Sequence, residues 1–292
     1  MTTLAAAPPG PDASVSARPP SRPGRRWGRA RSTLGRGSGI GLGIAMIWFS
    51  LLVLIPLGAL IVTATAGGWD QYVTTLGNAQ TWAAIRLTVG QALYVTLLNV
   101  VLGTVIAWVL VRDRFPGKAV LDVIIDIPFA LPTIVAGLVL LSLYGKDSPL
   151  GLDWANTERS VTLALAFVTL PFVVRTVQPV LEELEGDVEE AAASLGAGRL
   201  TIFRRIILPS LVPAIAAGAA LAFARAISEY GSLVLLSGNL PFRTEVVSVR
   251  VLTFIENGNT AAAAALASVM LAVALCVIVA LDLVQRRVAR RG

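Results

Sequence analysis

Long apolar stretches without charged residues recur along this chain and constrain its fold more than any other feature. A helix needs roughly 20 residues to cross a bilayer core of about 30 Å. Six stretches approach this length, and they lie within Ser38–Trp69, at Leu87–Val111, at Ile127–Gly145, from near Ser160, from near Ile206 and at Asn257–Leu281. Because 55% of the residues are hydrophobic and only 14% are charged, the chain is more apolar than a soluble domain. The sequence predicts an all-α polytopic membrane protein with about six transmembrane helices.

The fourth stretch is the shortest of the six and ends at a charge. It is uncharged only from Ser160 to Val174, which is 15 residues. For this stretch to span the membrane, Arg175 must lie at or near the membrane edge, where its side chain can reach water.

The distribution of Lys and Arg predicts the orientation, because cytoplasmic loops carry an excess of these residues. With the N-terminus in the cytosol, 18 of the 24 Lys and Arg residues fall inside and 6 fall outside. We therefore expect both termini in the cytosol. The formal net charge of +6 follows from this topology, and we expect no nucleic-acid partner, which would need a basic face on a soluble domain.

The residue content disfavours an enzyme. The chain has no histidine, which removes the usual catalytic triads, zinc sites and proton shuttles near neutral pH. Its single cysteine, Cys276, lies in the last apolar stretch, so no internal disulfide can form. We expect no catalytic residue and no metal site.

A loop before the fifth stretch reads EAAASLGAGRLTIFRRIILP from Glu190 to Pro209. The spacing of Asp187 and Glu190 matches a capping box. The residues that follow predict a short amphipathic helix, because apolar side chains recur at helical spacing, at Val188, Ala191, Ala192 and Leu195. Gly196 and Gly198 are expected to end this helix with a left-handed cap. A second short helix should follow, up to Pro209 at the entry of the fifth span.

Two such helices on the cytosolic face could fit a cleft in another protein, whereas the alternative is an ordinary interfacial loop helix. The loop resembles the EAA loop of permeases of ABC importers, through which the membrane subunit docks on a separate ATPase. The residues that carry the resemblance are Glu190, Ala191, Ala192, Gly196, Ile206, Leu208 and Pro209. The chain contains no GxxxxGK[ST] motif, so it has no ATPase site of its own. We expect no cofactor in this chain and ATP with Mg²⁺ in the partner.

Three further stretches narrow the resemblance. They read LDVIIDIPFALPTIVAGLVLLSLYG (Leu121–Gly145), PFVVRTVQPVLEEL (Pro171–Leu184) and FARAISEYGSLVLLSGNLPFRTEVVSVRV (Phe223–Val251). They look like sulfate/thiosulfate permease subunits of the CysT type, from about Trp82 to the C-terminus. The resemblance implies the type I ABC importer fold in a bacterial cell membrane. It also implies a homologous permease of the CysW type, two cytosolic ATPase subunits and an extracytoplasmic sulfate-binding protein.

These features divide the chain into four expected parts. Residues 1–38 form a basic, Pro- and Arg-rich cytosolic tail that cannot bury a core and should be disordered. Residues 39–81 contain the first transmembrane helix and an outer loop. The resemblance implies a permease domain over 82–285, and 286–292 form a basic cytosolic tail.

Charges at the outer end of the fifth span are candidates for the substrate route, since charges near a membrane are costly. Arg225 and Glu229 are one helical turn apart, with Ser228 and Tyr230 beside them. Arg225 and Ser228 could line an anion's path while Glu229 holds the arginine or takes part in a gate. The alternative is an interfacial pair that reaches for water.

A second pair of charges, Asp122 and Asp126, lies at the cytosolic start of the third span, where an interfacial role is favoured. Pro128 and Pro132 indicate a broken helix there. The pair also supports an alternative function, a proton-coupled secondary transporter. A permease for molybdate or a related oxyanion is a further alternative, and a membrane scaffold without transport would leave the EAA spacing unexplained.

Overall fold

The computed structural model describes residues 36–184 and 186–289, and the regular structure in these ranges is helical. The chain divides into two units at Ser50 and Leu51. In the first unit, the described residues form α1 (Arg36–Phe49), whose side chains from Gly39 onward are exposed. The predicted tail over 1–38 lies outside the described residues except for 36–38, with which α1 begins.

The second unit contains the remaining α-helices. Their bounds are α2 (Ile55–Thr65), α3 (Gly68–Gly77), α4 (Ala79–Arg112), α5 (Lys118–Ala130), α6 (Thr133–Tyr144), α7 (Glu158–Glu183), α8 (Gly186–Ser194), α9 (Arg199–Ile202), α10 (Leu208–Ile227), α11 (Gly231–Leu236), α12 (Val247–Glu256) and α13 (Thr260–Ala289). Two π-helical segments, Ser50–Leu54 and Phe203–Ile207, precede α2 and α10.

Five helical stretches of the described chain are long and apolar enough to cross a membrane. They are Gly39–Thr65, Ala79–Arg112, Glu158–Glu183, Arg199–Ile227 and Thr260–Arg287. A sixth span results if α5 and α6 are counted together. The predicted all-helical class with about six membrane helices is confirmed by length and composition.

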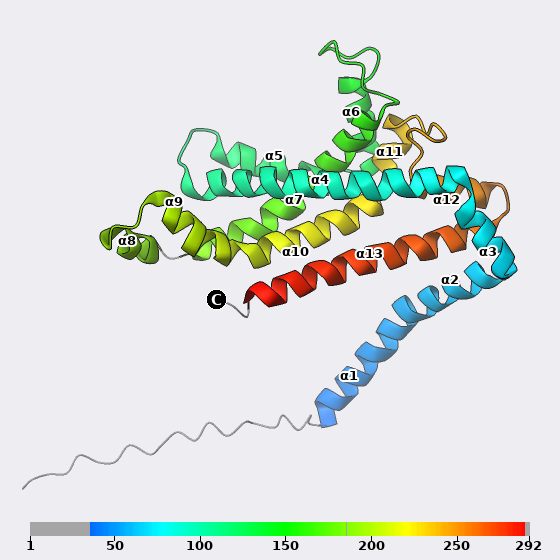
Figure 1. Ribbon diagram of the computed structural model, residues 1–292, viewed down its shortest axis with the longest axis horizontal. Coiled ribbons are helices and arrows are strands. Elements are labelled where there is room, and N and C mark those ends of the chain that lie inside the picture. The colour runs from blue at the N-terminus through cyan, green and yellow to red at the C-terminus, as the bar shows by residue number, and fades with distance from the viewer. Residues whose placement is uncertain (1–35, 185, 290–292) are drawn as a thin grey trace, which may run out of the picture. The chain divides into compact units, whose positions relative to one another are not determined.

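Four long helices form the centre of the second unit. In Figure 1, α4, α7, α10 and α13 run side by side, and the C-terminal ends of α4, α7 and α13 point toward the left side of the picture, where α8 lies. The helices approach closely at Val173 of α7, which faces Gly103 of α4 and Gly218 of α10. A Cβ on either glycine would lie 2.9–3.0 Å from Val173, so the small residues let these helices meet. Asn99 of α4 donates to the carbonyl of Ala166 of α7 at 3.1 Å, which adds a buried polar link.

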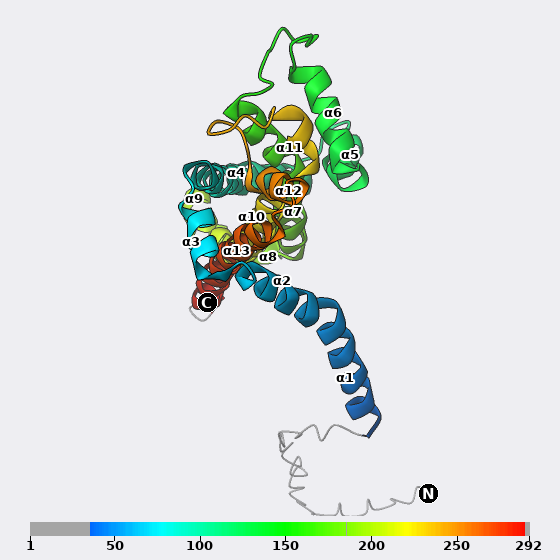
Figure 2. The same cartoon turned by 90° about the vertical axis from the view of Figure 1, so that its right-hand side faces the viewer.

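The third span is broken, as its prolines predicted. Helices α5 and α6 are bent by 117°, and the break falls at Leu131 and Pro132. A proline pushes the preceding residue out of the helical region, and Leu131 has an extended ψ of 136°. Pro128 lies inside α5. Figure 2 shows α5 and α6 on the side of the bundle away from α13.

The fourth span is longer than its uncharged stretch. Helix α7 begins at Glu158 and continues through Arg175 to Glu183. The helix therefore continues past Arg175, the charge that ends the uncharged stretch. The side chain of Arg175 has partners on α5, which are described below.

Candidate functional site

The loop that carries the EAA pattern begins with α8, and the end of α8 is a Schellman motif. Gly196 has a φ of +84°, in the left-handed region where side chains with a Cβ are strained. The N–H of Ala197 donates to the carbonyl of Ala192 at 3.1 Å, and the N–H of Gly196 donates to that of Ala193 at 2.9 Å. The predicted cap at Gly196 is confirmed. Gly198 has a φ of −70° and precedes α9 as its N-cap residue.

One side of α8 is apolar and exposed. The exposed fractions are 50% for Val188 and 89% for Leu195, both of which belong to the predicted apolar spacing. Glu190 and Ala191 are also exposed, while Ala192 packs partly on the core. The segment from Val188 in α8 to Leu195, just after its end, therefore presents apolar side chains that are half exposed or more.

The other side of α8 is held by α4. Arg112, the last residue of α4, forms an ion pair and hydrogen bond with Glu189, which is about one-quarter exposed. The Arg112 guanidinium also lies over the ring of Trp108, 5.6 Å from its centre, and Trp108 packs edge-on against Phe203 at 5.8 Å. Sequence reasoning missed this anchor. The predicted capping-box partner, the side chain of Asp187, lies outside the described residues.

The second helix of the loop is not separate from the fifth span. Helix α9, the π-helical segment and α10 continue from Arg199 to Ile227. The predicted boundary at Pro209 is therefore wrong, because the N–H of Leu208 bonds to the carbonyl of Phe203 five residues back and the helix continues through the proline. Ile206 and Leu208 are half-buried, and Pro209 is exposed.

Arg225 and Glu229 meet at the opposite end of α10. The Nη2 atom of Arg225 lies 2.6 Å from Oε2 of Glu229, without the alignment of a hydrogen bond. The Oε1 atom accepts from both the backbone N–H and the hydroxyl of Ser232, each at 2.8 Å. The side chain of Glu229 is 1% exposed and that of Arg225 is 27% exposed. The alternative of an interfacial pair that reaches for water is therefore wrong for Glu229. Its buried carboxylate instead binds the first turn of α11.

This carboxylate belongs to a crossing in which α6 and α11 touch through their backbones. A Cβ on Gly137 of α6 would lie 2.7 Å from the carbonyl oxygen of Ser232, and one on Gly231 would lie 2.9 Å from a backbone nitrogen of α6. The hydroxyl of Ser248 in α12 donates to the carbonyl of Glu229 at 2.7 Å. Glu229 thus links α10, α11 and α12 at the point where α6 crosses.

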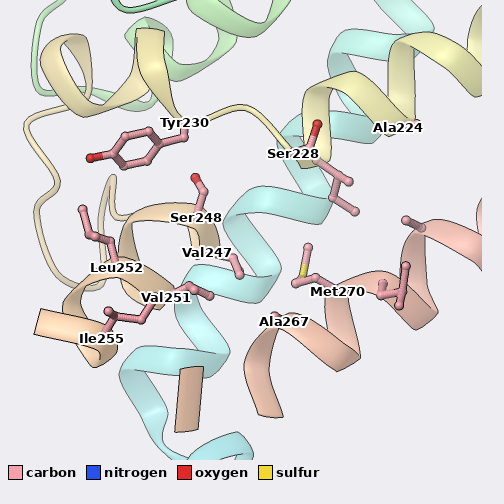
Figure 3. A pocket seen from close by; sticks show the side chains of 13 residues that line it. Ala224, Ser228, Tyr230, Val247, Ser248, Val251, Leu252, Ile255, Ala267 and Met270 are labelled. Carbon is pink, nitrogen blue, oxygen red and sulfur yellow. The ribbon is translucent and has the colours of Figure 1, made fainter. Parts of the chain in front are cut away.

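Ser228 and Tyr230 line a cavity of about 560 Å³ between α10, α12 and α13, as Figure 3 shows. Ser248 contributes a third hydroxyl, and the remaining lining residues are apolar. Arg225 and Glu229 do not line this cavity. The four predicted route residues therefore fall into two groups: Ser228 and Tyr230 line a largely apolar cavity, and Arg225 and Glu229 form an ion pair beside it. The residues that line the cavity include no cation that could attract an anion.

A charged cluster between α5 and α7 was not predicted. The guanidinium of Arg175 donates from Nε and Nη2 to the two carboxylate oxygens of Asp126, at 2.8 and 2.7 Å. It also donates at 2.8 Å to both the carboxylate and the backbone carbonyl of Asp122, and at 2.7 Å to Gln178. The signal in the sequence was the four-residue spacing of two aspartates on α5. The arginine partner lies 49 and 53 positions further on, beyond the reach of spacing rules.

A second buried polar cluster, also not predicted, holds the loop before α12 against the start of α4. Glu245 is 5% exposed and accepts from Nε2 of Gln80 at 2.7 Å. Arg250 lies 3.8 Å from the same carboxylate and stacks over the ring of Phe254 at 4.6 Å. Neither residue lies in a long apolar stretch, so hydropathy gave no sign of their burial.

Comparison with known proteins agrees with this geometry. Residues 99–291 match the family described as "Binding-protein-dependent transport system inner membrane component". The chain is 42% identical over 259 residues to the sulfate transport system permease protein CysT of Salmonella typhimurium, with coverage of 86% of this chain and 94% of the relative. It is 41% identical over 260 residues to the protein of the same name from Escherichia coli, at the same coverage.

Two solved structures have a similar fold. A bacterial ABC transporter involved in the import of the acidic polysaccharide alginate matches with a TM-score of 0.72 at 17% identity, over 85% of this chain and 94% of that chain. The inward-facing MetNI methionine ABC transporter matches with a TM-score of 0.53 at 18% identity, over 71% and 96%. At these identities the likeness supports the architecture alone.

Proposed function

Because this chain belongs to the family of binding-protein-dependent transport system inner membrane components, we propose that it is the permease subunit of an ABC importer that carries sulfate or thiosulfate into the cell. The observation that carries this proposal is the 42% identity to a sulfate transport system permease along 94% of that protein's length. The chain is a multi-pass protein of the bacterial inner membrane. It is a transporter subunit and not itself an enzyme.

The importer requires partners that supply energy and substrate. The sequence lacks a P-loop, so ATP and Mg²⁺ would be bound by a separate ATPase. We infer an assembly with two cytosolic ATPase subunits, a homologous permease of the CysW type and an extracytoplasmic sulfate-binding protein. Closure of the ATPase on nucleotide would drive alternating access of the membrane subunits.

In this proposal α8 is the part that docks on the ATPase. Val188 and Leu195 supply exposed apolar area, and Glu190 supplies a charge at its rim. Gly196 fixes the direction in which the chain leaves the helix. The ion pair between Arg112 and Glu189 would transmit a displacement of α8 to α4. The cytosolic placement of α8 follows from the N-in orientation inferred from Lys and Arg.

Arg225 is the residue that we propose for attracting the anion. One of its nitrogens faces Glu229, and its partial exposure leaves other N–H donors accessible. Glu229 would set the position of this guanidinium, while Ser228 and Tyr230 line the cavity beside it. An anion with two charges needs transient attraction along its route, and a single half-paired arginine suits passage better than a tight site.

Uptake of labelled sulfate in a strain that lacks this protein tests the function. Complementation should restore uptake, and unlabelled sulfate or thiosulfate should compete more strongly than molybdate. Stronger competition by molybdate would identify the related oxyanion permease instead. Uptake that continues after ATP depletion under an imposed proton gradient would identify a secondary transporter.

The docking role is tested with a pair of glycine variants. Gly196→Val places a side chain at a φ of +84° and should cost about 1 kcal/mol or more locally, which misdirects α8 and lowers ATP-driven uptake. Gly198→Ala is the matched control, because its φ of −70° suits any residue. Equal uptake and equal ATPase binding in both variants would remove α8 as the docking element.

A further inference from the structure

An open surface cavity of about 330 Å³ lies at the end of the bundle that is far from α8, and exposed charged side chains from three separate elements line it. Arg86 comes from α4, Glu158 from the start of α7, and Arg243 from the turn before α12. None of the three takes part in an ion pair within 4.0 Å in the described part of the chain. The cavity thus gathers two cations and one anion that do not neutralise one another by contact.

The neutral groups of this cavity add hydrogen-bond donors. The Oε1 atom of Gln91 accepts from the hydroxyl of Thr162 at 2.7 Å, so the amide nitrogen of Gln91 remains as a donor. Phe242, which is 62% exposed, has a φ of 64°, a left-handed conformation that is unusual for a bulky residue. Strain of this kind concentrates at functional sites. An exposed aromatic ring is also typical of the membrane interface.

An apolar stripe on α4 leads from this cavity along the bundle. Tyr94, Leu97 and Val101 follow Arg86 on one helix face, and their exposed fractions are 58%, 67% and 62%. At 1.5 Å per residue, the distance along the helix from Arg86 to Leu97 is about 16 Å, close to the thickness of one leaflet of the bilayer core. The charged cavity and the apolar stripe therefore have the dimensions of a headgroup and an acyl chain.

We propose that this cavity binds a phospholipid whose headgroup carries both a phosphate and a primary amine, as in phosphatidylethanolamine. Arg86 and Arg243, with the amide of Gln91, bind the phosphate oxygens, since guanidinium and phosphate form strong charge-assisted hydrogen bonds. Glu158 binds the ammonium group at the other end of the headgroup. One acyl chain lies along the stripe of α4.

The carboxylate selects this ligand over two others. A free divalent oxyanion would be repelled by Glu158, and a glycerol headgroup would bring no cationic group of its own to that carboxylate. The first turn of a helix favours an acidic residue, and this preference would explain the presence of Glu158 without any ligand. The same preference does not explain why two arginines from distant segments line the same cavity.

The test uses the assembled transporter in nanodiscs that contain equal amounts of phosphatidylethanolamine and phosphatidylglycerol. Lipids that remain bound after detergent washing are counted by native mass spectrometry. Wild type should retain phosphatidylethanolamine, and Arg86→Gln/Arg243→Gln should reduce that retention by about tenfold or more. Glu158→Gln should keep bound lipid but lose the preference for the amine headgroup. Arg159→Gln is the matched control, an exposed arginine beside Glu158 that does not line the cavity.

Two results overturn the proposal. One is equal retention of phosphatidylethanolamine in wild type and in the double arginine variant, with folding verified by size-exclusion chromatography. The other is arginine-dependent binding of labelled sulfate that phosphatidylethanolamine does not displace, which would assign the cavity to the transported oxyanion. Neither result bears on whether the importer carries sulfate, because uptake is measured separately.

Discussion

Glu229 gives the sharpest test of the structural reasoning, because its buried carboxylate supports α11 and faces Arg225. The substitution Arg225→Gln removes the counter-ion of Glu229, whose side chain is only 1% exposed. Removal of one partner from a buried pair costs about 3–5 kcal/mol. In Arg225→Gln the two hydrogen bonds from Ser232 continue to stabilise the carboxylate, and Arg225 itself is 27% exposed. We therefore expect this substitution to lower the free energy of unfolding by about 2–3 kcal/mol.

The double variant Arg225→Gln/Glu229→Gln should be more stable than Arg225→Gln alone. The glutamine carbonyl keeps an acceptor for Ser232, and no uncompensated charge remains buried. We expect the free energy of unfolding to recover by about 1–2 kcal/mol, a coupling within the range for residues in one network. Glu229→Ala is the contrasting variant, because it leaves both donors of Ser232 unsatisfied at about 1–3 kcal/mol for each buried group.

Equilibrium unfolding in mixed micelles, followed by tryptophan fluorescence, measures these differences. The reasoning fails if the two glutamine substitutions add without coupling, since the carboxylate would then not depend on the arginine. It also fails if Arg225→Gln leaves the free energy of unfolding unchanged. Sulfate uptake by the double variant separates the roles further, because a restored fold with lost uptake supports Arg225 as an anion-attracting residue.

Three other changes have defined outcomes. Arg175→Gln should lower the free energy of unfolding by about 1–3 kcal/mol, which is less than the loss expected for a fully buried pair because the two carboxylates are nearly half exposed. Adding Asp126→Asn should recover part of this loss in the same micelle assay. Gly137→Ala should destabilise the chain by about 1–3 kcal/mol, since the new methyl group would lie 2.7 Å from a backbone oxygen, whereas Gly58→Ala, with open space around it, should not. Arg112→Gln should lower sulfate uptake per ATP hydrolysed, because α8 loses its anchor on α4; an unchanged ratio in reconstituted vesicles would contradict this.

The sequence predicted the features that depend on local composition. Apolar length predicted the spans, Pro132 predicted the break between α5 and α6, and the glycine after the EAA helix predicted its left-handed cap. The missed features join residues far apart in the chain. Arg175 reaches Asp126 across 49 positions, and Gln80 reaches Glu245 across 165. From a single sequence, a charge in such a pair cannot be told apart from a charge at the membrane interface. The neighbouring residues in the sequence do not identify the distant partner that permits its burial.

The boundary predicted at Pro209 is wrong, and the continuous helix found there connects two parts of the molecule. A break there would leave the EAA loop joined to the fifth span through a flexible point. Instead, the 29 residues from Arg199 to Ile227 form one helical stretch, about 43 Å long at 1.5 Å per residue. This stretch begins next to α8 and ends two residues before Glu229, whose side chain bonds to Ser232 of α11 and whose carbonyl bonds to Ser248 of α12. If α8 docks on an ATPase as proposed, this stretch would connect a displacement at α8 with the Arg225–Glu229 pair. The π-helical turn before Pro209 therefore lets the helix continue across the proline.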